Sequence, residues 1–203
     1  MEGGSTKDVT RYRSIIGCLR YLCCTRPDLA FSVGMKSRYM EEPRSSHWKA
    51  AKRILQYIQG SKGMGIFYSK SKEYKLRAYS DSDWCGDIDD RKSTSGYVFY
   101  IGDTAFTWQP KKQPIVTLST CEAEYVAASW CICHAIWLKN LLKEIDLPQD
   151  EVIEIEMDSK SAIELAKNPV HHERSKHIDV RFHFIREKVA EKKVTLTHVK
   201  SRD

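Results

Sequence analysis

The sequence predicts an α/β fold in which a mixed five-stranded sheet is flanked by helices and preceded by a small helical segment. Two observations support this fold class. Apolar residues recur at helical spacing before residue 60, whereas short runs rich in β-branched and aromatic residues appear from residue 74 onward. These later segments follow the order strand, strand, strand, helix, strand, helix, helix, strand. Their short early connections favour an antiparallel meander, and a strand that follows a helical crossover favours parallel pairing with the first.

The first segment is predicted to contain three helices and one short strand, over residues 9–24, 28–41, 45–59 and 65–68. Pro27 and Pro43 interrupt the helical pattern because proline lacks the backbone donor that a helix needs. Gly60 is suited to end the third helix. The polar run 69–72 has the composition of a linker. We therefore expect two domains, over residues 1–70 and 71–203.

The second domain is predicted to begin with three strands joined by short turns, of which Gly102 and Asp103 form the second. A long amphipathic helix follows, then one strand, two helices and the last strand. The expected ranges are 74–81, 95–101 and 105–108 for the first strands, 119–144 for the helix, 152–157 for the fourth strand, 159–167 and 177–190 for the next helices, and 194–199 for the last strand.

Composition indicates a soluble intracellular protein, cytoplasmic or nuclear. The 203 residues are 41% apolar and 30% charged, as expected of a chain with a packed core. No run of about 18 apolar residues exists, so no membrane association is expected. The polar first residues lack the apolar core of a signal peptide. The seven cysteines form no pair of C-x-x-C units, which favours reduced thiols over a zinc site or disulfides.

Positive charge is concentrated in the first third of the chain. Residues 1–70 contain 13 Lys/Arg and 5 Asp/Glu, whereas residues 71–203 contain 20 and 22. A basic segment beside a slightly acidic one suits a polyanionic partner such as a nucleic acid. The alternative is an ordinary solvated surface, and charge alone does not exclude it.

Three acidic residues occupy element ends that a mixed sheet can bring together. Asp81 ends the first strand, Asp158 follows the fourth, and Glu124 lies in the first turns of the long helix. Neighbouring parallel strands end at the same sheet edge, and the helix would cross that edge. Carboxylate oxygens are the ligands that Mg²⁺ or Mn²⁺ prefers. Two such ions about 4 Å apart can stabilise the attacking and the leaving oxygen of a phosphodiester.

Each of these acids has a simpler alternative. Asp81 could be a turn residue, Glu124 a solvated helix residue, and Asp158 part of a helix cap with Ser159. The strand–helix–strand order of the three favours the nuclease interpretation.

Several motifs in this order resemble the RNase H domain of a Ty1/copia-type retrotransposon polyprotein. They include Tyr79-Ser80-Asp81-Ser82-Asp83-Trp84 and Leu118-Ser119-Thr120-Cys121-Glu122-Ala123-Glu124-Tyr125. Further matches lie at 91–99, 108–113, 156–162 and 176–187. Residues 12–17, 25–28 and 47–53 resemble the segment that joins polymerase to RNase H in such polyproteins. The polymerase's Tyr-x-Asp-Asp motif is absent from this sequence, so no DNA synthesis is expected.

The resemblance implies cleavage of RNA within an RNA–DNA hybrid, with the rest of a Pol polyprotein as a further partner. It assigns two Mg²⁺ or Mn²⁺ ions to Asp81, Glu124 and Asp158, and favours Glu124 over Glu122. His198 matches a family position linked to product release, although it could equally be a buried strand residue. For phosphate contacts the best candidates are Lys111 and Lys112, which precede the long helix, and the second set is Arg91, Lys92 and Ser93.

One difference between this sequence and the family pattern bears on the expected activity. The family pattern has a fourth acidic residue shortly after the final strand, and the sequence reaches only Asp203 there. We expect residues 71–203 to be an RNase H-like domain truncated at its C-terminus, with Asp179 a weaker substitute for the missing acid. The alternative function is therefore a catalytically impaired fragment that acts as a nucleic-acid-binding or protein-interaction module.

Overall fold

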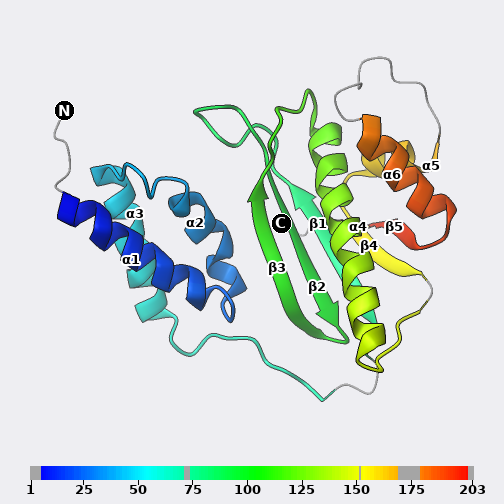
Figure 1. Ribbon diagram of the computed structural model, residues 1–203, viewed down its shortest axis with the longest axis horizontal. Coiled ribbons are helices and arrows are strands. Elements are labelled where there is room, and N and C mark those ends of the chain that lie inside the picture. The colour runs from blue at the N-terminus through cyan, green and yellow to red at the C-terminus, as the bar shows by residue number, and fades with distance from the viewer. Residues whose placement is uncertain (1–5, 71–73, 151, 169–178, 201–203) are drawn as a thin grey trace. The chain divides into compact units, whose positions relative to one another are not determined.

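The computed structural model describes residues 6–70, 74–150, 152–168 and 179–200. Contacts between Cα atoms divide the chain into two compact units, Met1–Tyr68 and Ser69–Asp203 (Figure 1). None of the helices in the described ranges combines the length and the apolar character that a membrane crossing requires.

The first unit consists of helices α1 (Thr6–Leu22), α2 (Pro27–Ser37) and α3 (Ser45–Gly60). Apolar residues from all three helices form its core: Tyr12, Ile16, Leu19, Leu29, Val33, Ala51 and Ile54. The buried Arg26 connects the break before α2 to the end of α3. Its guanidinium pairs with Asp28 at 2.7 Å and donates to Ser61 Oγ at 2.8 Å.

The strand predicted over 65–68 is wrong, because this stretch has no regular secondary structure. Phe67 is 84% exposed and Tyr68 65% exposed. A strand needs a partner for its backbone donors and acceptors, and the described residues of the first unit contain no other strand. The β-propensity of Ile66, Phe67 and Tyr68 is therefore not sufficient to form a strand here.

The second unit contains a mixed sheet in the order β3-β2-β1-β4-β5. Its strands are β1 (Leu76–Ser82), β2 (Thr94–Ile101), β3 (Thr104–Lys112), β4 (Ile153–Met157) and β5 (Val194–His198). β1 pairs antiparallel with β2 and parallel with β4, so the predicted sheet is confirmed. β3 is longer than predicted, because it pairs with β2 as far as Lys112 although Pro110 lies within it.

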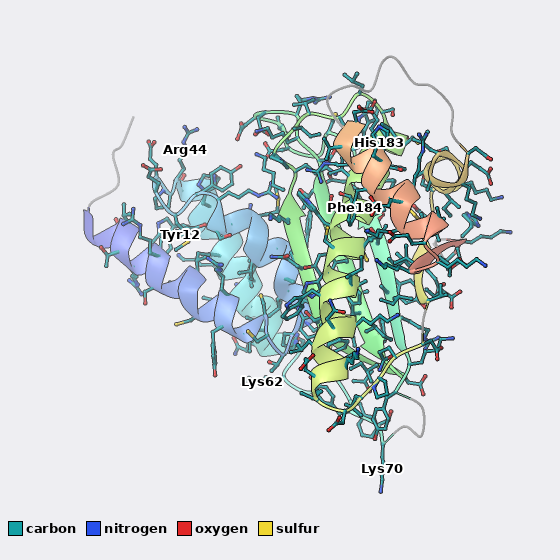
Figure 2. The ribbon with its side chains drawn as sticks, turned by 45° about the vertical axis from the view of Figure 1, so that its right-hand side comes forward. Tyr12, Arg44, Lys62, Lys70, His183 and Phe184 are labelled. Carbon is teal, nitrogen blue, oxygen red and sulfur yellow. The ribbon has the colours of Figure 1, made fainter. Side chains whose placement is uncertain are left out.

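Three helices accompany the sheet: α4 (Thr120–Glu144), α5 (Lys160–Lys167) and α6 (Asp179–Ala190). In Figure 1, α4 runs along the sheet while α5 and α6 lie near β4 and β5. Thirteen residues of α4 are buried, as expected of a central helix. Figure 2 labels two neighbours on α6. Phe184 packs against the core, and the side chain of His183 is largely exposed beside Asp179.

Candidate metal centre and nucleic-acid interface

Parallel pairing of β1 and β4 brings two acidic residues to one edge of the sheet. Tyr79 in β1 lies opposite Glu156 in β4, and the strands continue in the same direction to Asp81 and Asp158. One oxygen from each of Asp81, Glu124 and Asp158 lies within 4.8 Å of the others. The three predicted acids therefore meet, although 77 positions separate the first from the last.

Glu124 reaches the cluster from the start of α4. Ser119 begins this helix by accepting a hydrogen bond from the Glu122 backbone N–H at 3.2 Å, which fixes the first turn. Glu124 is buried, and its Oε1 accepts a hydrogen bond from the Ser82 backbone N–H at 3.1 Å. Its Oε2 is buried and lacks a hydrogen-bond partner in the part of the chain that the structure describes.

The electrostatics of the cluster favour protons or cations. Burial, followed by the charges of Asp81 and Asp158, raises the pKa of Glu124 to about 8. Burial and the nearby charge of Asp158 also raise the pKa of Asp81. Carboxylates this close repel one another, so the fully ionised cluster is unfavourable without a counter-charge. The hard oxygens and the unpaired Glu124 Oε2 fit a divalent cation that prefers carboxylates.

Glu122 has a different position from Glu124. Its Oε2 accepts a hydrogen bond from the Leu118 backbone N–H at 2.8 Å, four residues earlier. It therefore closes the start of α4, and it is not a member of the three-acid cluster.

His198 ends β5 opposite Met157, the residue that precedes Asp158. Its side chain is exposed, so the alternative of a buried strand residue is wrong. Asp179 begins α6, where it faces His183 at 3.7 Å, and it does not join the three acids. Asp203 lies outside the described residues.

Gln113 is a positioning residue that the sequence reasoning missed. It is 1% exposed, and its Nε2 donates to Ser95 Oγ at 2.8 Å and to the Ala123 backbone carbonyl at 2.9 Å. Ser82 Oγ lies 3.2 Å from the same nitrogen. The side chain thus joins β1, β2 and α4 next to the acids. The sequence offers only a glutamine after two lysines at the end of a strand, and because glutamine is rarely buried this pattern does not indicate a buried role.

The residues predicted to contact phosphate have different neighbours in the structure. Lys112 Nζ lies 2.5 Å from Asp87 Oδ2 and 2.9 Å from Asp90 Oδ1, so two carboxylates occupy it. Lys92 lies 3.6 Å from Asp90, and Arg91 adopts a positive φ of 57° in the same loop. Ser93 is fully buried and bonds to the backbone N–H of Cys85.

Asp87 lies in a turn and is 4% exposed. Its hydrogen bond with Lys112 lowers its pKa to about 2. Lys111 differs from its neighbour, because its Nζ lies 4.9 Å from the centre of the Trp130 ring.

Several curated proteins are similar to this chain over almost its whole length. The retrovirus-related Pol polyprotein from transposon TNT 1-94 of Nicotiana tabacum is 45% identical over 193 residues, 95% of this chain and 14% of that protein. The corresponding polyproteins from transposons RE2 and RE1 of Arabidopsis thaliana are 41% and 40% identical over 202 residues, 100% of this chain and 14% of each protein. This chain thus spans 14% of the length of these relatives. No family model matches it.

Solved structures are similar at low sequence identity. The foamy viral protease-reverse transcriptase in complex with dsDNA matches with a TM-score of 0.50 and 14% identity, over 96% of this chain and 38% of that chain. Its dRH form in complex with ds DNA matches with a TM-score of 0.52 and 14% identity, over 96% and 32%. RNase H1 from Halobacterium salinarum NRC-1 gives a TM-score of 0.43 and 18% identity, over 62% and 86%. At these identities the likeness concerns the fold alone.

Proposed function

Because this chain belongs to the retrovirus-related Pol polyproteins of plant transposons and has an RNase H-like sheet, we propose that its second unit hydrolyses RNA in RNA–DNA hybrids with divalent metal ions. The observation that carries the proposal is the cluster of Asp81, Glu124 and Asp158, with one oxygen of each within 4.8 Å of the others. Three acids from two parallel strand ends and one helix suit a phosphodiester hydrolase better than a structural role, because their mutual repulsion disfavours the metal-free fold.

Asp81, Glu124 and Asp158 would hold the metal, and two Mg²⁺ or Mn²⁺ ions are the proposed cofactors. When bound, such ions supply a nucleophilic hydroxide at neutral pH and neutralise the charge that develops on the phosphate. The burial of Glu124 and the hydrogen bond from Ser82 hold one ligand in place before any ion arrives. Preorganised ligands need little rearrangement when they bind a cation.

The surrounding residues have separate proposed roles. Gln113 positions the start of α4 through its bond to the Ala123 carbonyl, one residue before Glu124. His198 is exposed at the strand end beside Asp158, where it could assist the departure of the cleaved strand. Lys111 is the best-placed cation for a hybrid phosphate, because Asp87 and Asp90 already occupy Lys112.

The proposal also covers the role of the first unit and the cellular compartment of the protein. We propose that residues 1–70 correspond to the connection between polymerase and RNase H, and that the rest of a Pol polyprotein is a partner. We also propose an intracellular location, cytoplasmic or nuclear, where cysteines are kept reduced.

The decisive experiment is cleavage of a hybrid carrying a labelled RNA strand, with Mg²⁺ and with chelator. Metal-dependent cleavage that Asp81→Asn abolishes, while the melting temperature of the metal-free protein is retained, supports the proposal. A labelled RNA duplex and a DNA duplex serve as substrate controls, and both should remain intact. Uncut hybrid at all metal concentrations would contradict catalysis.

One observation favours the second candidate, a catalytically impaired binding module. Only three carboxylates gather at the sheet edge within the described residues, and Asp179 lies elsewhere on α6. A hybrid that the wild-type protein shifts on a gel without cutting would select this function.

A further inference from the structure

A shallow pocket lies between α4 and the antiparallel half of the sheet, apart from the acidic cluster. Its volume is about 280 Å³, and its lining includes Tyr97 on β2, Gln109 and Lys111 on β3, and Trp130, His134 and Trp137 on α4. We call it the ring pocket. This volume is just below the roughly 300–1,000 Å³ typical of pockets for drug-sized molecules. A single flat ring system suits it better than a large ligand does.

Aromatic rings form one continuous side of the ring pocket. The Tyr97 and His134 rings stack with centres 5.0 Å apart, and the Trp137 ring follows at 5.3 Å from His134. The Tyr97 hydroxyl donates to Gln109 Oε1 at 2.8 Å, which holds the first ring in place. Trp137 is 55% exposed. A soluble protein that leaves a tryptophan half exposed beside two stacked rings offers a surface for a further ring.

Two cations lie near the Trp130 ring, and of these only Lys111 is among the described residues that line the ring pocket. Lys111 Nζ is 4.9 Å, and Arg181 Cζ is 5.7 Å, from the centre of the Trp130 ring. Arg181 also donates to Ser129 Oγ at 2.8 Å, which fixes its guanidinium. No carboxylate is among the described residues that line the pocket. Its electrostatic character therefore favours an anionic ligand.

The sheet register places Lys111 close to the acidic cluster. Ser82 at the end of β1 pairs with Ser95, which pairs with Lys111 on β3. Neighbouring strands lie about 4.8 Å apart, so the Lys111 backbone is about 10 Å from that of Ser82 across the sheet. A polynucleotide strand leaving the cluster could reach Lys111 within about two nucleotides, given a phosphate spacing of several ångströms.

We propose that the ring pocket binds an unpaired stretch of single-stranded polynucleotide, with a base stacked on Trp137 and a neighbouring phosphate at Lys111 and Arg181. Alternating aromatic and cationic side chains are the usual means of binding single strands, because every base has a π-face and every nucleotide has a charge. The site requires no metal, so it does not depend on the catalytic part of the proposed function.

Charge complementarity favours this occupant over a protein partner. The cores of protein–protein interfaces are depleted in lysine, whereas the ring pocket has a lysine and an arginine against its tryptophan. A base with its phosphate satisfies both the rings and the cations. An apolar peptide would leave the two cations without counter-charges.

The test measures binding of a fluorescein-labelled oligo(dT) strand by anisotropy, with all divalent metal chelated. Trp137→Ala should weaken binding about 5- to 150-fold, the effect expected from loss of one stacked base. Trp137→Phe should retain most of the affinity. Lys111→Ala should lower the slope of log affinity against log salt by about 0.7, as expected for one phosphate contact on a single strand. Tyr74→Ala is the matched control, because Tyr74 is a 51% exposed aromatic outside the pocket.

Two results would overturn the inference. One is equal affinity of the wild type, Trp137→Ala and Tyr74→Ala for the strand, with unchanged circular dichroism melting curves. The other is a wild-type dimer by light scattering that Trp137→Ala makes monomeric, which would make the pocket a protein interface. Because the assay contains chelator, an inactive protein can still pass it. Failure of hybrid cleavage and failure of single-strand binding are therefore separate results.

Discussion

The backbone N–H of Ser82 donates a hydrogen bond to Glu124 Oε1 at 3.1 Å, and so joins the end of β1 to the first turns of α4. The bond fixes the carboxylate while it leaves Oε2 buried and without a partner among the described residues. An unsatisfied buried acceptor costs about 1–3 kcal/mol. A proton or a divalent cation on Oε2 would satisfy this acceptor.

Glu124→Gln should abolish metal binding without unfolding the protein. The amide oxygen can still accept the bond from Ser82, but the charge that attracts a cation is gone. We expect hybrid cleavage to fall by at least about 100-fold, since loss of a metal removes several kcal/mol of transition-state stabilisation. Calorimetric titration with Mn²⁺ and the hybrid assay measure the two effects.

Glu122→Gln is the matched control for that experiment, because Glu122 lies two residues before Glu124, is outside the three-acid cluster, and accepts a hydrogen bond at Oε2 from the Leu118 backbone N–H. It should retain Mn²⁺ binding and cleavage. If Glu122→Gln is the inactive variant, the assignment of the metal ligand to Glu124 is wrong.

The raised pKa of Glu124 makes metal-free stability depend on pH. With a pKa of about 8 in the folded protein and an ordinary value of 4.5, the folded state keeps a proton that the unfolded chain has lost between these limits. The contribution of Glu124 to the free energy of unfolding is therefore fully present below pH 4.5. It is lost as the pH rises through 8. Urea unfolding with chelator should show this decline, and Glu124→Gln should remove it.

Metal binding should show the opposite pH trend. A cation must displace the Glu124 proton below pH 8, so Mn²⁺ affinity should rise by about tenfold per pH unit up to that point and then level off. Calorimetry in buffers of different ionisation enthalpy would detect about one released proton near pH 7. Affinity that is constant from pH 6 to 9 would contradict a protonated Glu124.

Sequence patterns were sufficient for the sheet and for the acidic cluster. The alternation in β1 and the crossover before β4 predicted their parallel pairing, and this pairing alone brings Asp81 near Asp158. The sequence pattern gave a wrong prediction where tertiary contacts determine the local structure. Residues 65–68 have strand propensity, but the described residues of the first unit contain no strand to pair with them. Gln113 could not be identified because its three bonds involve residues from 10 to 31 positions away.

Gln113→Ala should destabilise the second unit by about 2–4 kcal/mol. It opens a cavity and leaves Ser95 Oγ and the Ala123 carbonyl without their donor in a buried region. Because Ala123 precedes Glu124, Mn²⁺ affinity should also fall. Urea unfolding and Mn²⁺ titration test the two effects, with the exposed Gln109 replaced by Ala as a stability control. Equal stability of both variants would remove the positioning role of Gln113.

Lys111 and Lys112 are adjacent in sequence, yet the structure predicts opposite consequences for their removal. Lys112→Ala leaves the buried Asp87 without its cation, and we expect a loss of about 1–3 kcal/mol, reduced from the value for a fully buried pair because Lys112 is partly exposed. Asp87 has a pKa of about 2, so its stabilising ion pair is complete above pH 3.8 and disappears as the pH falls through 2. The stability difference between wild type and Lys112→Ala should shrink over the same interval.

Lys111→Ala should instead leave stability almost unchanged and weaken hybrid binding, because no carboxylate lies among the pocket-lining residues that the structure describes. The slope of log affinity against log salt should fall by about 0.8 for one lost phosphate contact, between the values for double and single strands. Anisotropy with a labelled hybrid over a salt series measures the slope, and Asp81→Asn as the background prevents cleavage during the measurement. A larger change in slope for Lys112→Ala than for Lys111→Ala would show that Asp87 and Asp90 release Lys112 to the nucleic acid.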